Sequence, residues 1–358
     1  MNEVQIDLMN NGAGQGQVAD TMMSGTSPGH MRPYLGEDGK TYIVVHKGGD
    51  PLKKENYQAF QVNTTGTLRR DEWKALDEAV VKVAETRLTG INDLVSRGLV
   101  YNLGNGFGTT VLETTTVSDA LNAELTMDAV ARAKGDRQTF STTYLPLPII
   151  HCDYEINARV LAASRNMGNA LDTSMAERAS RKVAEKLESM LFTATTYAFG
   201  GGTIYSYLNY PHRNTMTLGT AWTSETGVNI VKKVSDMKQE SLDNLHYGPW
   251  VLYIPPTYET RMDADYSDVK GTNTIRERIL QIAGITDVKV IDTLPDGHVL
   301  LVQMTSDVVR LVRGMAIQNV QWNVEGNMVT KFKVMTIQVP QLRSDDNNKT
   351  GIVHATGS

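Results

Sequence analysis

The chain has 358 residues, of which 41% are hydrophobic and 21% are charged, and its formal net charge is −5. This length supports two or three compact units, and the composition excludes a largely disordered chain. No stretch reaches the roughly 18 apolar residues of a membrane-spanning helix, and the acidic balance argues against broad neutralisation of nucleic acid phosphates.

The basic residues and the cysteine bear on the compartment. No basic residue precedes Arg32, so the sequence predicts no basic signal or transit peptide, and we expect the protein to stay where it is made. Cys152 is the single cysteine and cannot form an internal disulfide, which is typical of a reducing cytosol.

Residues 1–67 do not have the pattern of a domain. They show little hydrophobic periodicity, and only the stretch 34–45 predicts a small hairpin, with its turn at Asp38 and Gly39. Such a segment cannot build its own core. It is either disordered or an arm that becomes ordered by lying on something else.

Residues 71–90 have the spacing of an amphipathic helix. Trp73, Leu76 and Val80 lie three to four positions apart and form one apolar stripe. Gly90 precedes a shorter helical piece that closes at Gly98.

Residues 104–146 change to strand-like composition. Gly104, Gly106 and Gly108 alternate and are followed by a run rich in threonine and valine, and strand-like residues return after a turn near Lys134. A long two-stranded ribbon is the simplest interpretation, with the three glycines as a hinge at its base. A lone hairpin is marginally stable, so we expect this ribbon to need a neighbour.

The clearest helix in the sequence begins at Ser174, where Ser174 and Glu177 have the spacing of a capping box. The triple glycine at 200–202 predicts its end. The apolar stripe comprises Met175, Ala179, Val183, Leu187, Met190, Leu191, Ala194 and Ala198. The opposite, solvated face comprises Glu177, Arg178, Arg181, Lys182, Glu185, Lys186 and Glu188.

A mixed region follows this helix. Buried strands are predicted at 249–256, 288–294 and 298–304, and short helices at 257–266 and 275–285. Three antiparallel strands follow up to about residue 340, with a hairpin turn at Glu325 to Asn327. The final residues, 346–358, are polar and are expected to form a tail.

Signatures of catalysis are absent from the sequence. The glycines at 104–108 are spaced GxGxG and precede strand-like residues, so they do not fit a dinucleotide loop, and the glycines at 200–202 lack a phosphate-binding lysine. The seven histidines are scattered without a metal-ligand spacing, and no serine lies in a GxSxG motif. We therefore expect no enzyme activity, cofactor or metal.

Five blocks, taken in order, resemble one family. The chain looks like a tailed-bacteriophage major capsid protein, of the superfamily shared with encapsulin shell proteins, and the resemblance covers roughly residues 68–340. The blocks are RRDEWKALDEAVVKVAETRLTGINDLVSRG, PLPIIHCDYEINARV, NALDTSMAERASRKVAEKLESMLF, YGPWVLYIPPTYETRMDADY and ITDVKVIDTLPDGHVLLVQM. They are similar to that superfamily's N-terminal helix, the strand leaving its extended loop, its spine helix, and two parts of its axial domain.

The resemblance implies an α+β fold of the phage major capsid type. It has an N-terminal arm, an extended β-hairpin loop, a peripheral domain with a long spine helix, and an axial domain. The expected divisions are the arm at 1–67, the N-terminal helix region at 68–103, the extended loop at 104–146, the peripheral domain at 147–205, the axial domain at 206–306, the peripheral return sheet at 307–345 and the C-terminal tail at 346–358.

The resemblance also implies a function. The expected protein self-assembles as pentamers and hexamers into the icosahedral head that encloses the double-stranded DNA of a tailed bacteriophage. It would be found in the virion and assembled in the bacterial host cytoplasm, with portal, scaffolding or decoration proteins as further partners and no membrane. The candidate subunit-contact residues are Trp73, Gly104, Gly106, Gly108, Arg132, Lys134 and Arg137.

Two alternatives stay open. One is an encapsulin-like compartment that loads a cargo enzyme, although encapsulins begin almost directly with the helix and this chain has some 67 residues before it. The other is a soluble α/β enzyme that uses the region 206–306, which would form small oligomers with a ligand-filled cleft.

Overall fold

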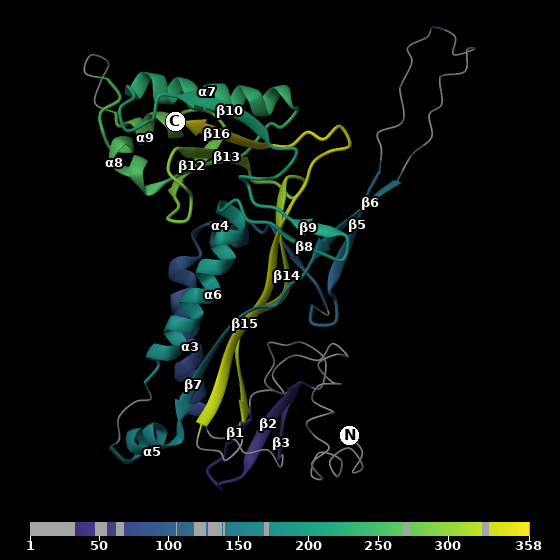
Figure 1. Cartoon of the computed structure of the whole chain (residues 1–358), viewed down its shortest axis with the longest axis vertical. Coiled ribbons are helices and arrows are strands. Elements are labelled where there is room, and N and C mark those ends of the chain that lie inside the picture. Colours follow the sequence, from purple (N-terminus) through teal and green to yellow (C-terminus); the bar gives the residue numbers. More distant parts are fainter. Residues whose placement is uncertain are drawn as a thin grey trace.

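The computed structural model shows two stacked units and a projecting ribbon (Figure 1). The upper unit is a five-stranded sheet with helices on one face, and the lower unit is a long four-stranded sheet with two helices along it. The residues that the structure describes are 33–46, 56–61, 68–104, 106–117, 127, 138, 140–167, 172–267, 273–323 and 329–357.

The lower sheet has the strand order β4-β14-β15-β7, and one antiparallel hairpin, β14 with β15, forms its centre. The prediction of antiparallel strands is confirmed, except that the two expected strands between 307 and 324 form one strand. The predicted turn at Glu325 to Asn327 lies outside the described residues. The strands are β4 (Val100–Asn102), β7 (Ile150–Asn157), β14 (Val309–Asn323) and β15 (Val329–Leu342).

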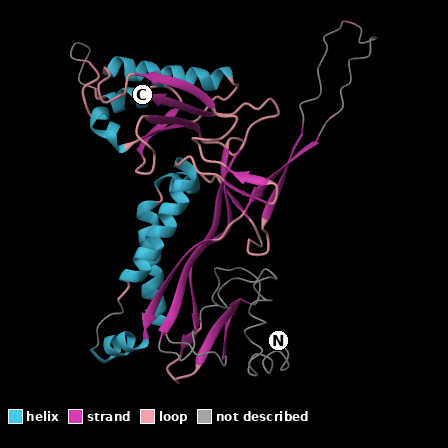
Figure 2. Ribbon diagram, viewed as in Figure 1, coloured by secondary structure: helices cyan, strands magenta, loops and turns pink. Residues whose placement is uncertain are grey.

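Helices α3 and α6 lie along one face of this sheet (Figure 2). Both predicted amphipathic helices are confirmed, as α3 (Arg70–Arg87) and α6 (Ser174–Phe192). Their apolar stripes pack on β7 and β15 around the buried ring of Phe332, which stacks on Tyr154 at 5.1 Å. The short helix α5 (Ala158–Met167) follows β7.

The two ends of α6 differ from the prediction. Thr173 is the N-cap, and its hydroxyl donates to the Glu177 carboxylate at 2.9 Å in place of a capping box on Ser174. The helix ends at Phe192, because the threonine-rich residues that follow favour an extended chain. The glycines at 200–202 are therefore not a helix stop. Gly200 and Gly201 form the turn between β8 (Tyr197–Phe199) and β9 (Gly202–Ile204), and Gly202 begins β9.

The upper sheet has the order β10-β16-β13-β11-β12. Side chains alternate along β11, so Trp250 and Leu252 face the helices while Val251 and Tyr253 face the lower unit. The strands are β10 (Asn214–Gly219), β11 (Trp250–Ile254), β12 (Ile285–Val290), β13 (His298–Gln303) and β16 (Ile352–Gly357). The helices are α7 (Gly227–Asp243), the 3-10 turn η3 (Pro256–Tyr258), α8 (Glu259–Met262) and α9 (Ile275–Leu280).

The expected polar tail at 346–358 is wrong. Residues Ile352–Gly357 form β16, which lies between β10 and β13, parallel to the first and antiparallel to the second. Ile352 and Val353 have no exposed surface. In the sequence, polar residues flank Ile352 and Val353, and they obscured a strand that is buried on both faces.

The N-terminal hairpin is confirmed as β1 (Tyr34–Leu35) paired with β2 (Thr41–His46), and β3 (Tyr57–Gln61) adds a third strand that the sequence did not predict. The backbone N–H of Leu35 donates to Leu68, which connects this sheet to the start of α3. After α3, the chain forms α4 (Thr89–Ser96), and Gly98 ends it with a positive φ of 72°, as predicted.

Candidate functional site

The ribbon is confirmed as two antiparallel strands, β5 (Val111–Val117) and β6 (Phe140–Pro146). It projects away from the lower sheet (Figure 1). The strand β6 is exposed from Phe140 to Tyr144, and the Phe140 ring keeps 69% of its surface in solvent. Large exposed aromatic side chains on a two-stranded ribbon are typical of a segment that packs against a partner.

The β8–β9 hairpin holds the base of the ribbon. Gly202 lies so close to β6 that a Cβ atom there would be 2.2 Å from the carbonyl oxygen of Tyr144. A Cβ at Gly200 would be 2.7 Å from the Val111 side chain, and the positive φ of Gly200 also favours glycine. Gly202 thus allows two backbones to approach closely.

The three glycines predicted as a hinge have different surroundings. Gly106 is buried, and a Cβ there would lie 2.1 Å from the Cα of Gly314 in β14. Gly104 is exposed, with no atom within 4 Å of such a Cβ, and Gly108 is also exposed. The hinge stays a hypothesis, and Gly106 has a packing reason of its own to be glycine.

Trp73 does not lie where a subunit contact was expected. It is 5% exposed, its ring packs edge-on against Phe332 at 5.9 Å, and its Nε1 donates to the carbonyl of Pro33 at 3.1 Å. Trp73 instead belongs to the core between α3 and the lower sheet. The other candidates, Arg132, Lys134 and Arg137, lie outside the described residues.

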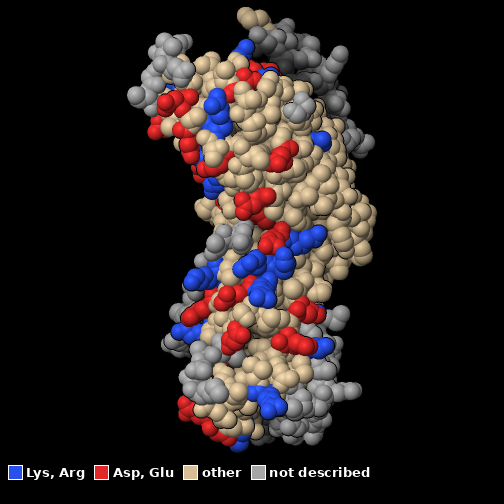
Figure 3. All heavy atoms as spheres, turned by 60° about the vertical axis from the view of Figure 1, so that its left-hand side comes forward, with Lys and Arg blue, Asp and Glu red and all other residues tan. Residues whose placement is uncertain are grey.

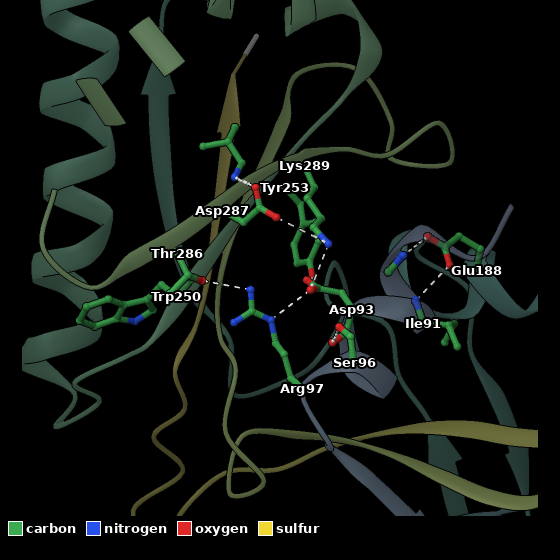
Figure 4. A network of polar contacts seen from close by, with 12 residues as sticks. Ile91, Asp93, Ser96, Arg97, Glu188, Trp250, Tyr253, Thr286, Asp287 and Lys289 are labelled. Atoms are coloured by element: carbon green, nitrogen blue, oxygen red, sulfur yellow. Dashed lines mark hydrogen bonds and ion pairs between the residues drawn. The ribbon is translucent and has the colours of Figure 1, made fainter. Parts of the chain in front are cut away.

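A polar network connects α4 of the lower unit with the upper sheet (Figure 4). Asp93, 2% exposed, accepts from the Tyr253 hydroxyl at 2.7 Å, from Arg97 Nε at 3.0 Å and from Lys289 Nζ at 3.1 Å. Arg97 also donates to Thr286 on β12 at 3.1 Å. Burial alone would raise the pKa of Asp93, but its three donors outweigh burial and keep that pKa below the ordinary value.

Glu188, on α6, lies beside the N-terminal end of α4. Its side chain is also buried, so its assignment to the solvated face of α6 is wrong. Its carboxylate accepts from the backbone N–H groups of Gly90 at 2.6 Å and Ile91 at 3.4 Å. Leu88, the N-cap of α4, supplies no side-chain acceptor, so Glu188 performs that function from another helix. Burial raises the pKa of Glu188 to about 7, although the two N–H donors oppose this shift.

These two carboxylates make the junction between the units a polar site inside an apolar core. Asp93 is paired with two cations, Arg97 and Lys289, whereas Glu188 takes up a proton near neutral pH. The hydrogen bonds of both carboxylates go to side chains and backbone groups of the same chain. These bonds therefore hold α4 in place between α6 and the upper sheet.

In the described part of the chain, no group of three or more histidine, cysteine or acidic side chains lies close enough together to hold a metal ion. No described helix is long and apolar enough to cross a membrane. An open polar groove of about 570 Å³ lies between the ribbon, the β8–β9 hairpin and residues 341–346.

Solved structures with the same fold are shell proteins. A virus-like particle from Pyrococcus furiosus aligns with a TM-score of 0.58 and 16% identity, covering 79% of this chain and 98% of that one. The capsid of Myoviridae phage XM1 aligns with a TM-score of 0.57 and 12% identity, covering 74% and 91%. In sequence, the chain is 27% identical to "Type 1 encapsulin shell protein EncA" of Myxococcus xanthus (strain DK1622) over 223 residues, 61% of this chain and 72% of that protein.

The fold is thus the one that tailed-phage capsid proteins and encapsulin shell proteins share, as the resemblance predicted. Within that class, residues 63–355 match the family described as "Family of unknown function (DUF6260)". The chain belongs to this family.

Proposed function

We propose that the protein is the major capsid protein of a tailed bacteriophage. It self-assembles as pentamers and hexamers into an icosahedral head that encloses double-stranded DNA, and it acts in the virion after assembly in the bacterial host cytoplasm. The shell fold supports the proposed self-assembly. The main observation in its favour is the exposed ribbon, because Phe140 and Tyr144 of β6 lie in solvent. A neighbouring subunit would cover them.

The proposed contents follow from charge and from the arm. Acidic and basic side chains are interspersed over the helical side of the lower unit, without one broad basic field (Figure 3). With a net charge of −5, the shell would hold DNA loosely and without sequence specificity. The 69 residues before α3 favour a phage capsid arm that lies on neighbouring subunits. Portal, scaffolding or decoration proteins would be further partners.

An encapsulin-like compartment is the second candidate function. The 27% identity to the Myxococcus xanthus encapsulin shell protein favours it. In this alternative, the same subunit contacts would form the shell, but the contents would be a cargo enzyme in place of DNA.

Enzyme activity of the chain itself has little support. The buried carboxylates Asp93 and Glu188 are bonded to groups of the same chain, and each has a structural use in the junction. We propose a structural protein without a cofactor.

Electron microscopy of the purified full-length protein tests the proposal. Closed icosahedral particles are expected, and particles isolated from the natural host should protect duplex DNA from added nuclease. Particles that contain a co-purifying protein and no protected DNA would favour the compartment. Small discrete oligomers under all conditions would contradict both shell functions.

A further inference from the structure

The loop after α7 presents two apolar side chains to solvent. Leu245 is 63% exposed and Tyr247 is 69% exposed, while His246 between them is buried. Leu245 has a positive φ of 65°, a region that a bulky residue rarely adopts. Leu245 directly follows the C-cap of α7, where this conformation commonly ends a helix, and the bonds from Leu245 to Leu242 and from His246 to Ser241 impose it.

Hydrogen bonds fix this loop. The N–H groups of Leu245 and His246 donate to α7 carbonyls at 2.9 and 3.0 Å, and Asn244 Nδ2 donates to Asn214 at 3.1 Å. Gly248 N–H donates to the Gln303 side chain at 3.2 Å. The two apolar side chains are therefore held in solvent by a preorganised loop, which lowers the entropic cost of binding a partner.

The C-terminal end of α7 does not have the charges that its helix dipole favours. Its last turn contains Glu240 and Asp243 and no basic residue, although the dipole favours a cation there, and Lys238 lies just before this turn. Lys232 lies nearer the start, where Glu225 precedes the helix as the dipole favours. The acidic side chains at the C-terminal end are therefore not explained by the stability of the helix.

The two ends of α7 are complementary. Val228 is 44% exposed and lies one turn before the exposed Lys232, so these two form a basic and apolar stripe near the helix start. Asp243, Leu245 and Tyr247 form an acidic and apolar corner at the other end. Glu225, just before the helix, is engaged by Thr226 and Asn229.

We propose that the Asp243–Tyr247 corner of one subunit docks on the Val228–Lys232 stripe of a second copy of this chain. This inference rests on the proposed self-assembly and names one of its contacts. A helix of 17 residues separates the two surfaces by about 25 Å, so they cannot meet within one chain. A contact between different surfaces of identical chains is head-to-tail, and it closes into a ring when the rotation between copies permits.

Cysteine pairs test the direction of the contact. In full-length protein that carries Cys152→Ser, Val228→Cys and Tyr247→Cys are introduced separately, and each protein is oxidised alone and after mixing before assembly. A disulfide-linked dimer is expected only in the mixture, and the double variant should give a ladder up to a closed ring. A dimer from Tyr247→Cys alone would indicate a two-fold contact and overturn the proposal.

Leu245→Gly separates assembly from folding. Glycine accepts the positive φ, so the subunit should melt at the same or a higher temperature, while the yield of particles falls several-fold. Asn348→Gly is the matched control, because Asn348 has a φ of 60° on an exposed polar turn. Normal particle yield from Leu245→Gly would overturn the proposal.

A charge exchange adds a third readout. Asp243→Lys and Lys232→Asp should each weaken association about two- to fivefold per contact, and the double exchange should restore it. Failure of wild-type protein to form particles would be seen before any variant is tested, and it would contradict the proposed function together with this inference. Wild-type particles without the mixed disulfide would overturn this inference alone.

Discussion

The upper sheet and the ribbon are both antiparallel or mixed β-structures, but they bury very different shares of their side chains. Every residue of β11 is buried, because helices cover one face of the upper sheet and the lower unit covers the other. In β6, only Leu145 and Pro146 are buried, and these lie at the base. The upper unit is thus stabilised within one chain, whereas most of β6 in the ribbon stays exposed to solvent.

The largest expected effect is in the upper sheet. Leu301→Ala in β13 removes a side chain with no exposed surface, and we expect the free energy of unfolding of the unassembled subunit to fall by about 2–5 kcal/mol. Urea denaturation measures this loss. A change below about 1 kcal/mol would show that the upper sheet is less tightly packed than its burial indicates.

The junction should show a pH dependence. Because the pKa of folded Glu188 is about 7, against an ordinary value of 4.5, the folded protein retains a proton that the unfolded chain releases between these pH values. The resulting stabilisation is complete below pH 4.5 and is lost as pH rises through 7, with a total of about 3 kcal/mol.

The free energy of unfolding, measured from pH 4.5 to 8, should therefore fall as pH rises. In Glu188→Gln this part of the pH dependence should be absent. Glu185→Gln, on the exposed side of the same helix, is the control and should leave the profile unchanged. The same slope in wild type and Glu188→Gln would assign the pH dependence to another group.

The base of the ribbon should respond to a single methyl group. Gly106→Ala places a Cβ against the backbone of Gly314, and we expect a loss of about 1–3 kcal/mol. Gly104→Ala is the matched control, because its Cβ would meet nothing within 4 Å. If both variants melt like wild type but assemble poorly, the hinge hypothesis gains support over the packing explanation.

The smallest effect on the subunit is expected within the ribbon. Thr142→Ala removes an exposed hydroxyl from β6 and should change the free energy of unfolding by less than about 0.5 kcal/mol. Phe140→Ser should be similarly mild in the unassembled subunit but should lower particle yield, as sedimentation would measure. A strong loss of subunit stability in either variant would show that the ribbon contributes to the fold of the subunit as the upper sheet does.

The elements that the sequence predicted well are those whose signal is local. Periodic apolar positions located α3 and α6, and an apolar run between turns located β11. The helix α7 was not predicted, although Ile230, Val234 and Met237 recur at helical spacing and are buried. That spacing is the local signal that locates it.

The junction depends on contacts that no local pattern encodes. Glu188 belongs to a charged run, and its partners Gly90 and Ile91 lie 98 and 97 positions away. Asp93 is joined to Tyr253 across 160 positions. A lone carboxylate on a helix is ordinarily solvated, so only the tertiary arrangement reveals that these two are buried.

The position of β16 has a consequence for the order in which the chain folds. It separates β10 from β13, yet the ribosome produces it only after β14 and β15, two strands of the other sheet. During synthesis, the upper sheet therefore lacks the strand between β10 and β13 until the long hairpin of the lower sheet has been made. Translation therefore completes the strands of the lower sheet first, so a subunit with a finished upper sheet already contains all the strands of its lower one.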